Sequence, residues 1–149
     1  MSFLKRKKAA AARNGGGFMG YSIKRECLQM ILEASKEHYP MEFAALLSAK
    51  NKVIDELVLI PGTVAGDAHA IFHMWNAPVD FSIVGTVHSH PSHSARPSDA
   101  DLAFFSDNGP VHIITAMPFD TDSWRAYDAG GNRITLQLVD RGLPNSVQF

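Results

Sequence analysis

Residues 85–101 read GTVHSHPSHSARPSDAD, and this segment is the most informative part of the chain about its fold and chemistry. Its first part is rich in β-branched residues that favour a strand, and Pro91 ends that strand because proline has no backbone N–H. Side chains two residues apart on a strand project from the same face, so His88 and His90 can present both imidazoles to one point. A helix is expected next, and Asp101 in its first turn can direct a carboxylate back toward the end of the strand.

Two imidazoles and one carboxylate form a three-ligand set for zinc. Such a set leaves the fourth coordination position open for water, which is the arrangement of a catalytic rather than a structural zinc site. Each part also has an ordinary interpretation: a His-x-His pair is common on strands, and Ser98 followed by Asp101 resembles a helix cap. The combination of these patterns in one chain favours the metal site. His93 is expected to face solvent, because a fourth protein ligand would displace the water.

The rest of the chain alternates between strand and helix patterns. Apolar residues recur at spacings of three and four over residues 24–38, which predicts an amphipathic helix that Pro40 ends. A second helix is expected over 99–106, and turns are expected at 49–52 and 130–132. The segments expected to form strands are 21–23, 43–47, 53–60, 68–74, 83–88, 111–116, 124–127 and 134–139. This order predicts a single α/β (α+β) domain with a mixed, mostly antiparallel sheet.

Composition excludes several classes of protein. The chain has 149 residues, of which 46% are hydrophobic and 19% charged, as in ordinary soluble globular proteins. No apolar run approaches the ~20 residues that span a bilayer, so an integral membrane protein is not expected. The basic cluster at residues 5–8 is followed by only four alanines, too few for a secretory signal, so a cytoplasmic location is expected. The single cysteine, Cys27, excludes an intrachain disulfide and is interpreted as a small core residue.

Charge is distributed unevenly along the chain. Residues 1–18 carry five of the 14 Lys and Arg residues and no acidic residue, which leaves nine basic against 15 acidic residues in the remainder. An acidic body is unsuited to binding nucleic acid phosphates. We therefore expect a basic, Gly-rich flexible arm over residues 1–18, joined through the glycines at 15–17 to one catalytic domain over residues 19–149.

Several remaining polar and aromatic residues are expected to have structural roles. His69, His73 and His112 fall on expected strands, where packing or hydrogen bonding is the more common role of a histidine. Trp75 and Trp124 are expected to pack in the core or at its rim, although either residue would also suit the wall of a groove.

The motif resembles that of a known family. The sequence His88-Ser89-His90, the seven residues 91–97 and then Ser98-x-x-Asp101 are similar to the JAMM motif of the MPN+ metalloproteases. Upstream, residues 40–47 (PMEFAALL) resemble the glutamate-bearing strand of that family. The resemblance covers about residues 19–139 and is closest to the short stand-alone archaeal members.

This resemblance implies a fold and a set of residue roles. The fold would be a single MPN-type domain, a curved sheet flanked by helices and similar to that of cytidine deaminases. Zinc would be held by His88, His90 and Asp101, and would lower the pKa of its water to roughly 7. Glu42 would act as general base and then general acid, and Ser98 would donate a hydrogen bond to the oxyanion.

The resemblance also implies a function, for which three alternatives remain open. The first is an isopeptidase that removes ubiquitin-like modifiers from their conjugates. The second is a peptidase that processes a sulfur-carrier protein, and the third is a scaffold module that contains zinc only for structure. In the first two cases the partner is the extended tail of a ubiquitin-like or sulfur-carrier protein, with neither a specific nucleic acid nor a membrane expected. The short connection at 107–110 leaves no room for a second insertion, so selectivity for one polyubiquitin linkage is not expected.

Overall fold

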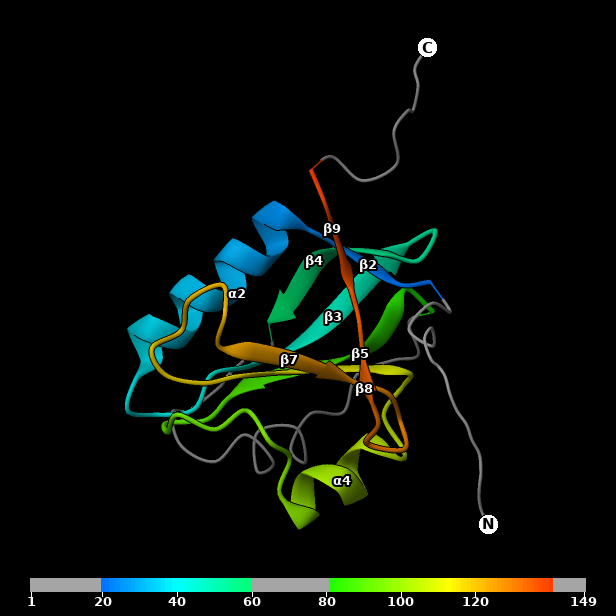
Figure 1. Cartoon of the computed structure of the whole chain (residues 1–149). Coiled ribbons are helices and arrows are strands. Elements are labelled where there is room, and N and C mark those ends of the chain that lie inside the picture. The colour runs from blue at the N-terminus through cyan, green and yellow to red at the C-terminus, as the bar shows by residue number, and fades with distance from the viewer. Residues whose placement is uncertain (1–19, 60–80, 141–149) are drawn as a thin grey trace.

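The computed structural model describes residues 20–59 and 81–140, which fold around one eight-stranded sheet (Figure 1). The strand order is β8-β7-β6-β5-β3-β4-β2-β9. The strands are β2 (Ser22–Lys24), β3 (Ala44–Lys50), β4 (Val53–Leu59), β5 (Ile83–Ser89), β6 (Val111–Thr115), β7 (Trp124–Tyr127), β8 (Arg133–Ile134) and β9 (Gln137–Val139). The helices in these residues are α2 (Arg25–His38) and α4 (Asp99–Phe105), which confirms both predicted helices.

The sheet is mixed, as the sequence predicts. Strand β3 pairs antiparallel with both β4 and β5, and β7 pairs antiparallel with both β6 and β8. Strand β5 pairs in parallel with β6, and β2 pairs in parallel with β4 and β9. Strands β5 and β6 approach closely at Gly85, where a Cβ would overlap the carbonyl of Val111. The pairing therefore makes β5, which carries the histidine motif, a central strand with partners on both sides.

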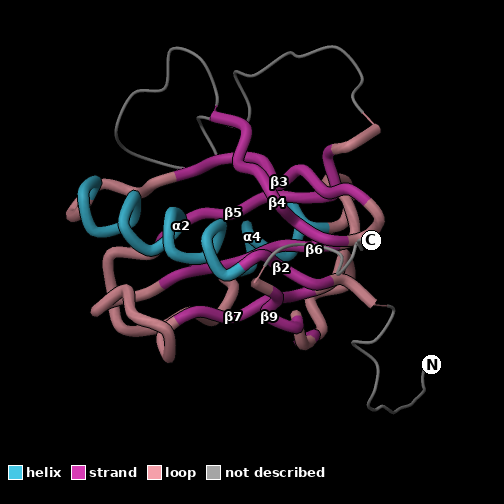
Figure 2. The backbone as a smooth tube through the Cα atoms, turned by 90° about the horizontal axis from the view of Figure 1, so that it is seen from above, coloured by secondary structure: helices cyan, strands magenta, loops and turns pink. Residues whose placement is uncertain are grey.

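The two helices cover opposite faces of the sheet (Figures 1 and 2). The apolar stripe of α2 packs on one face against alternate residues of the central strands, including Ala45, Val87 and Ile113. The intervening residues of the same strands turn to the other face, where Ala44 and Leu46 pack near α4. Since side chains alternate along a strand, the even-numbered residue His88 lies on the α4 face.

Cys27 belongs to the apolar stripe of α2, and it is only 2% exposed. Burial, together with the nearby carboxylate of Asp55, raises the pKa of its thiol to about 11. A thiol with this pKa stays protonated near neutral pH and is a poor nucleophile. The interpretation of Cys27 as a small core residue is confirmed.

The last predicted hairpin is only half correct. Strand β8 pairs antiparallel with β7 across the turn at 130–132, as expected. The chain then breaks at residues 135–136, where Leu136 enters the core, and β9 pairs in parallel with β2 at the other edge of the sheet. With two residues between them, the Cα atoms of Ile134 and Gln137 can be at most roughly 11 Å apart. The edge strands β8 and β9 therefore lie near each other, and the sheet is strongly curved. Burial of Leu136 outweighs the local strand pattern of residues 134–139.

Some predictions fall on residues outside the described ranges. These are the basic arm at 1–18, the strand at 68–74, and the residues His69, His73 and Trp75. Trp124 is half-buried and packs against the main core cluster, as expected. In residues 20–59 and 81–140, no helix is both long enough and apolar enough to cross a membrane.

Candidate metal site

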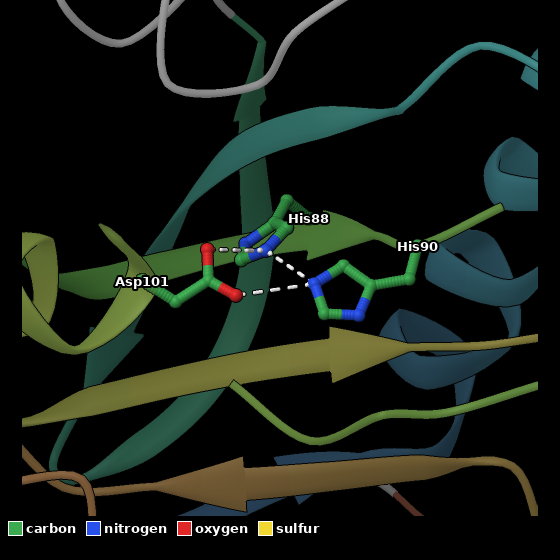
Figure 3. Close-up of side chains that lie close together, drawn as sticks. All are labelled: His88, His90 and Asp101. Carbon is green, nitrogen blue, oxygen red and sulfur yellow. Dashed lines mark hydrogen bonds and ion pairs between the residues drawn. The ribbon is translucent and has the colours of Figure 1, made fainter. Parts of the chain in front are cut away.

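His88, His90 and Asp101 lie together on the α4 face of the sheet (Figure 3). The Nε2 atoms of the two histidines are 3.2 Å apart. The carboxylate of Asp101 reaches both rings, with Oδ1 3.2 Å from His88 Nε2 and Oδ2 3.1 Å from His90 Nε2. His88 and Asp101 are each 2% exposed, and His90 is half-buried. The structure thus brings together the three residues that the sequence predicts to be metal ligands.

His90 is oriented by its backbone and by its second ring nitrogen. It follows the last residue of β5, and its backbone N–H donates to the carbonyl of Thr115 on β6 at 2.8 Å. Its Nδ1–H donates to the carbonyl of Ser94 at 2.9 Å, which turns Nε2 toward Asp101. Burial lowers the pKa of His90, but the bonds to Asp101 and Ser94 outweigh it and raise this pKa above 6.5.

Asp101 caps its own helix while it faces the histidines. Ser98 is the N-cap residue of α4, and its Oγ accepts the N–H of Asp101 at 3.0 Å. In return, Oδ2 of Asp101 accepts the N–H of Ser98 at 2.9 Å, which completes a capping box. Burial raises the pKa of Asp101, but the hydrogen bonds from both histidines and Ser98 outweigh it and hold the pKa well below its ordinary value. Capping and metal binding are therefore compatible roles for this carboxylate.

The donor set fits Zn²⁺. All three ligand atoms lie within 4.8 Å of one another, and imidazole nitrogen with carboxylate oxygen is a common zinc ligand set. Zinc–ligand bonds of ~2.0–2.1 Å in a tetrahedron place neighbouring ligand atoms roughly 3.3 Å apart. The Nε2–Nε2 separation of 3.2 Å is close to that value, and each Nε2 has one oxygen of the Asp101 carboxylate at 3.1–3.2 Å. In the described residues, this is the one cluster of its kind, and the exposed His93 is not part of it.

Glu42 lies close enough to the ligands for its charge to act on His90. Strands β3 and β5 are paired antiparallel, with Ala44 opposite His88. Continuing this register by two residues places Glu42 opposite His90, and directly opposed residues have their Cβ atoms about 4.5–5.5 Å apart. The half-buried Glu42 carboxylate is also among the charges that raise the pKa of His90.

Ser89 is a residue of the site that sequence reasoning did not single out. It stands between the two histidines and is buried, with 1% exposure. Its N–H donates to the carbonyl of Phe43 at 2.9 Å, and its Oγ accepts the N–H of Phe43 at 2.8 Å. These two bonds fix the residue next to Glu42 against the strand that carries the ligands. A serine between two same-face histidines must point away from them, and this alternation was the available signal.

His112 is packed and hydrogen-bonded, as expected. Its Nε2–H donates to the carbonyl of Gly109 at 2.8 Å, and its Nδ1 accepts the hydroxyl of Thr86 at 2.7 Å. Its ring stacks on Phe105 of α4, with centroids 4.3 Å apart. His112 therefore belongs to the core beside the site and not to the ligand cluster.

Comparison with known proteins agrees with this geometry. Residues 24–127 match the family model described as prokaryotic homologues of the JAB domain. A protein of Haloferax volcanii, named as a probable metalloprotease, is 36% identical over 137 residues, which cover 85% of this chain and 84% of the relative.

Two solved structures are also similar. A JAB1/MPN domain protein from Archaeoglobus fulgidus superposes with a TM-score of 0.65 at 38% identity, covering 81% of this chain and 98% of that one. A structure described as a JAMM metalloprotease-like zinc site in the proteasome and signalosome gives 0.65 at 39% identity, covering 80% and 98%.

These matches define the class to which the fold and site belong, a JAMM metalloprotease-like domain with the MPN fold. The chain belongs to the family of prokaryotic homologues of the JAB domain. The relatives and the His-His-Asp cluster together support a zinc metallopeptidase.

Proposed function

We propose that this protein is a zinc-dependent isopeptidase that removes ubiquitin-like modifiers from their conjugates by attack of an activated water. The observation that carries the proposal is the position of a carboxylate base beside a three-ligand metal cluster. The β3–β5 register, continued two residues past Ala44 and His88, would place Glu42 opposite His90, and the charge of Glu42 helps to raise the pKa of His90. A scaffold module with structural zinc needs a closed site and has no use for such a base.

In this proposal, His88, His90 and Asp101 hold the metal. When bound, zinc lowers the pKa of a water to roughly 7 and polarises the scissile carbonyl. Glu42 accepts the proton of the attacking water and then delivers it to the leaving amine. The Asp101 carboxylate stays ionised throughout, since its pKa is held well below the ordinary range.

Ser98 is proposed to donate to the oxyanion that forms at the scissile carbonyl. Its Oγ accepts the N–H of Asp101, but a hydroxyl has two acceptor lone pairs and one donor proton. The capping bond therefore leaves the proton available for a developing negative charge. The capping box also holds Ser98 beside Asp101, which a preorganised donor requires.

An apolar groove of about 830 Å³ supports a folded protein substrate. It lies between α2 and β4, and its walls include Met30 and Leu59, which are 57% and 64% exposed. Ala44 of β3 lines the groove and pairs with His88 of β5, so the groove ends one strand away from the ligands. We propose that an apolar patch of the modifier docks here while its tail extends to the metal. The groove is also lined by three glutamates of α2, which favour a modifier with basic residues around that patch: Glu26, Glu33 and Glu37.

A strand edge next to the groove suits an extended tail. In β4, the residues that pair with β2 are Val53 and Ile54. Within residues 20–59 and 81–140, residues 55–59 of β4 have no strand partner on the side away from β3. An extended peptide added to such an edge has its carbonyls aligned by main-chain hydrogen bonds. Glycines at the end of the tail would allow its backbone to approach the metal where a Cβ would clash.

The test is cleavage of a panel of modifier conjugates that end in Gly-Gly, with lysine side-chain or peptide amine leaving groups. Glu42→Gln should keep zinc and lose about 10²–10⁴-fold in kcat, the usual contribution of a general acid–base group. Asp140→Asn is the matched control, because it removes an exposed carboxylate whose partner is Arg25. A Glu42→Gln variant with full activity would contradict the mechanism.

The substrate is tested separately from the chemistry. A bulky residue in place of the penultimate glycine of the tail should sharply lower kcat/KM. If unfolded peptides without a modifier were cleaved equally well, the protein would be a general peptidase and the modifier hypothesis would be wrong.

A further inference from the structure

The loop at residues 91–97 joins the histidine strand to the helix that carries Asp101. Most of this loop is exposed, but Ala95 is buried, with 7% exposure. Its carbonyl accepts a hydrogen bond from the hydroxyl of Tyr127 on β7 at 2.8 Å. Tyr127 is itself only 3% exposed, so this bond is shielded from water. An exposed loop with few apolar contacts takes its shape largely from such bonds.

The Tyr127 bond lies one peptide away from an interaction that orients a proposed ligand. Ala95 follows Ser94, and the carbonyl of Ser94 accepts the Nδ1–H of His90. The position of that carbonyl determines how the His90 ring is turned and which nitrogen faces Asp101. A displacement of Ala95 therefore moves the acceptor that holds the His90 ring.

The ring of Tyr127 contacts the helix that carries Asp101. It stacks on Phe105 of α4, with centroids 5.9 Å apart and an angle of 26° between the planes. Phe105 is fully buried and belongs to the same helix as Asp101. Ala95, Phe105 and Tyr127 form one buried cluster with Ile114 and Ala116.

We propose that Tyr127 is a positioning residue for the metal site. Through its hydroxyl it holds the loop that orients His90, and through its ring it holds the helix that presents Asp101. It acts on His90 and Asp101 only through the loop and the helix that carry them, and it contacts neither substrate nor metal. This inference rests on the proposed metal site. Loss of the Tyr127 hydroxyl should weaken metal binding more than it weakens folding.

The experiment compares Tyr127→Phe with the unaltered full chain. Phenylalanine keeps the ring that stacks on Phe105 and removes only the hydroxyl. Zinc affinity is measured by competition with a chromophoric chelator, and ligand geometry by the visible absorption spectrum of the cobalt-substituted protein. We expect about tenfold weaker zinc binding, at the lower end for residues that orient metal ligands, and an altered cobalt spectrum. The Tm of the metal-free protein should fall by only a few degrees.

A control variant and a second test variant examine the two contacts of Tyr127 separately. Tyr21→Phe removes a hydroxyl from a half-buried tyrosine that contacts Lys52 outside the site, and it should leave zinc affinity unchanged. Phe105→Leu keeps the Tyr127 hydroxyl and weakens the stacking that positions α4, so it should lower Tm by more than Tyr127→Phe does and should also weaken zinc binding. Zinc affinity and cobalt spectrum equal to those of the unaltered chain in Tyr127→Phe would overturn the inference and leave the proposed function intact. An unaltered chain that binds no zinc would overturn both.

Discussion

His88 and His112 lie on neighbouring parallel strands, on the same face of the sheet, and both are almost fully buried. Their surroundings nevertheless differ. The Nε2 of His88 faces the Nε2 of His90 and the carboxylate of Asp101, each at 3.2 Å. Both nitrogens of His112 are hydrogen-bonded to neutral groups, the hydroxyl of Thr86 and the carbonyl of Gly109.

This comparison shows that burial and strand position do not distinguish a ligand from a core histidine. A hydroxyl and a carbonyl satisfy a neutral imidazole completely, and burial lowers the pKa of His112 to about 4. A second imidazole nitrogen and a carboxylate instead concentrate lone pairs at one point, and such a cluster requires a proton or a cation between its members. The atoms that face each nitrogen, rather than its depth, separate the two roles.

The largest expected difference between the two histidines is in metal content. His88→Ala should reduce bound zinc from about one per chain to none, because two ligands rarely hold zinc in water. His112→Gln should keep the zinc, since glutamine can still donate to Gly109. Elemental analysis of the purified proteins measures both. Zinc retained in His88→Ala, or lost in His112→Gln, would contradict the assignment of His88 as a metal ligand and His112 as a core residue.

The parts of the site that could be predicted are those encoded by spacing. The i, i+2 alternation placed His88 and His90 on one face, and a helix start placed Asp101 near them. The Ser89 and Tyr127 contacts could not be predicted, because the first depends on strand register and the second joins residues 32 positions apart. The pairing of β9 with β2 could not be predicted for a similar reason. Local pattern extended residues 134–139 as one strand, whereas the chain crosses to the opposite sheet edge.

A second, smaller effect is expected at Ser98, whose Oγ already accepts the N–H of Asp101. If a hydrogen-bonded group is always purely structural, as His112 is, Ser98→Ala should lower only stability. We expect instead that kcat falls about 10²-fold, the typical loss of an oxyanion donor, while zinc remains bound. The loss of the cap should cost about 1 kcal/mol of stability in addition.

Kinetics and thermal melts on the same preparation of Ser98→Ala separate these effects. Ser106→Ala provides a control, because Ser106 is the C-cap residue of the same helix, and its exposed hydroxyl donates to the carbonyl of Ala103. It should change neither kcat nor zinc content. An unchanged kcat in Ser98→Ala, with reduced Tm, would make Ser98 a helix cap only.

The smallest expected effect is the pH dependence of stability contributed by His112. Its pKa is lowered from an ordinary value of 6.5 to about 4, mainly by burial. As pH falls from 6.5 toward 4, His112 binds a proton in the unfolded chain but not in the folded chain. The free energy of unfolding therefore decreases. Between pH 7 and pH 5 this single group should cost about 2 kcal/mol of stability. The contribution of His112 is fully present above pH 6.5.

His90 should act in the opposite direction, and the measurement must separate the two. The pKa of His90 is raised, so its contribution to the stability of the metal-free protein is present below 6.5 and declines as pH rises. Urea unfolding of metal-free wild type and metal-free His112→Gln at pH 5 and pH 7 cancels the His90 contribution, because both proteins retain that residue. Wild type should lose about 2 kcal/mol more than the variant on acidification, since glutamine does not titrate. Equal losses in the two proteins would mean that His112 takes up its proton in the folded state as readily as in the unfolded chain. The neutral bonds to Thr86 and Gly109 would then no longer distinguish it from the histidines of the metal site.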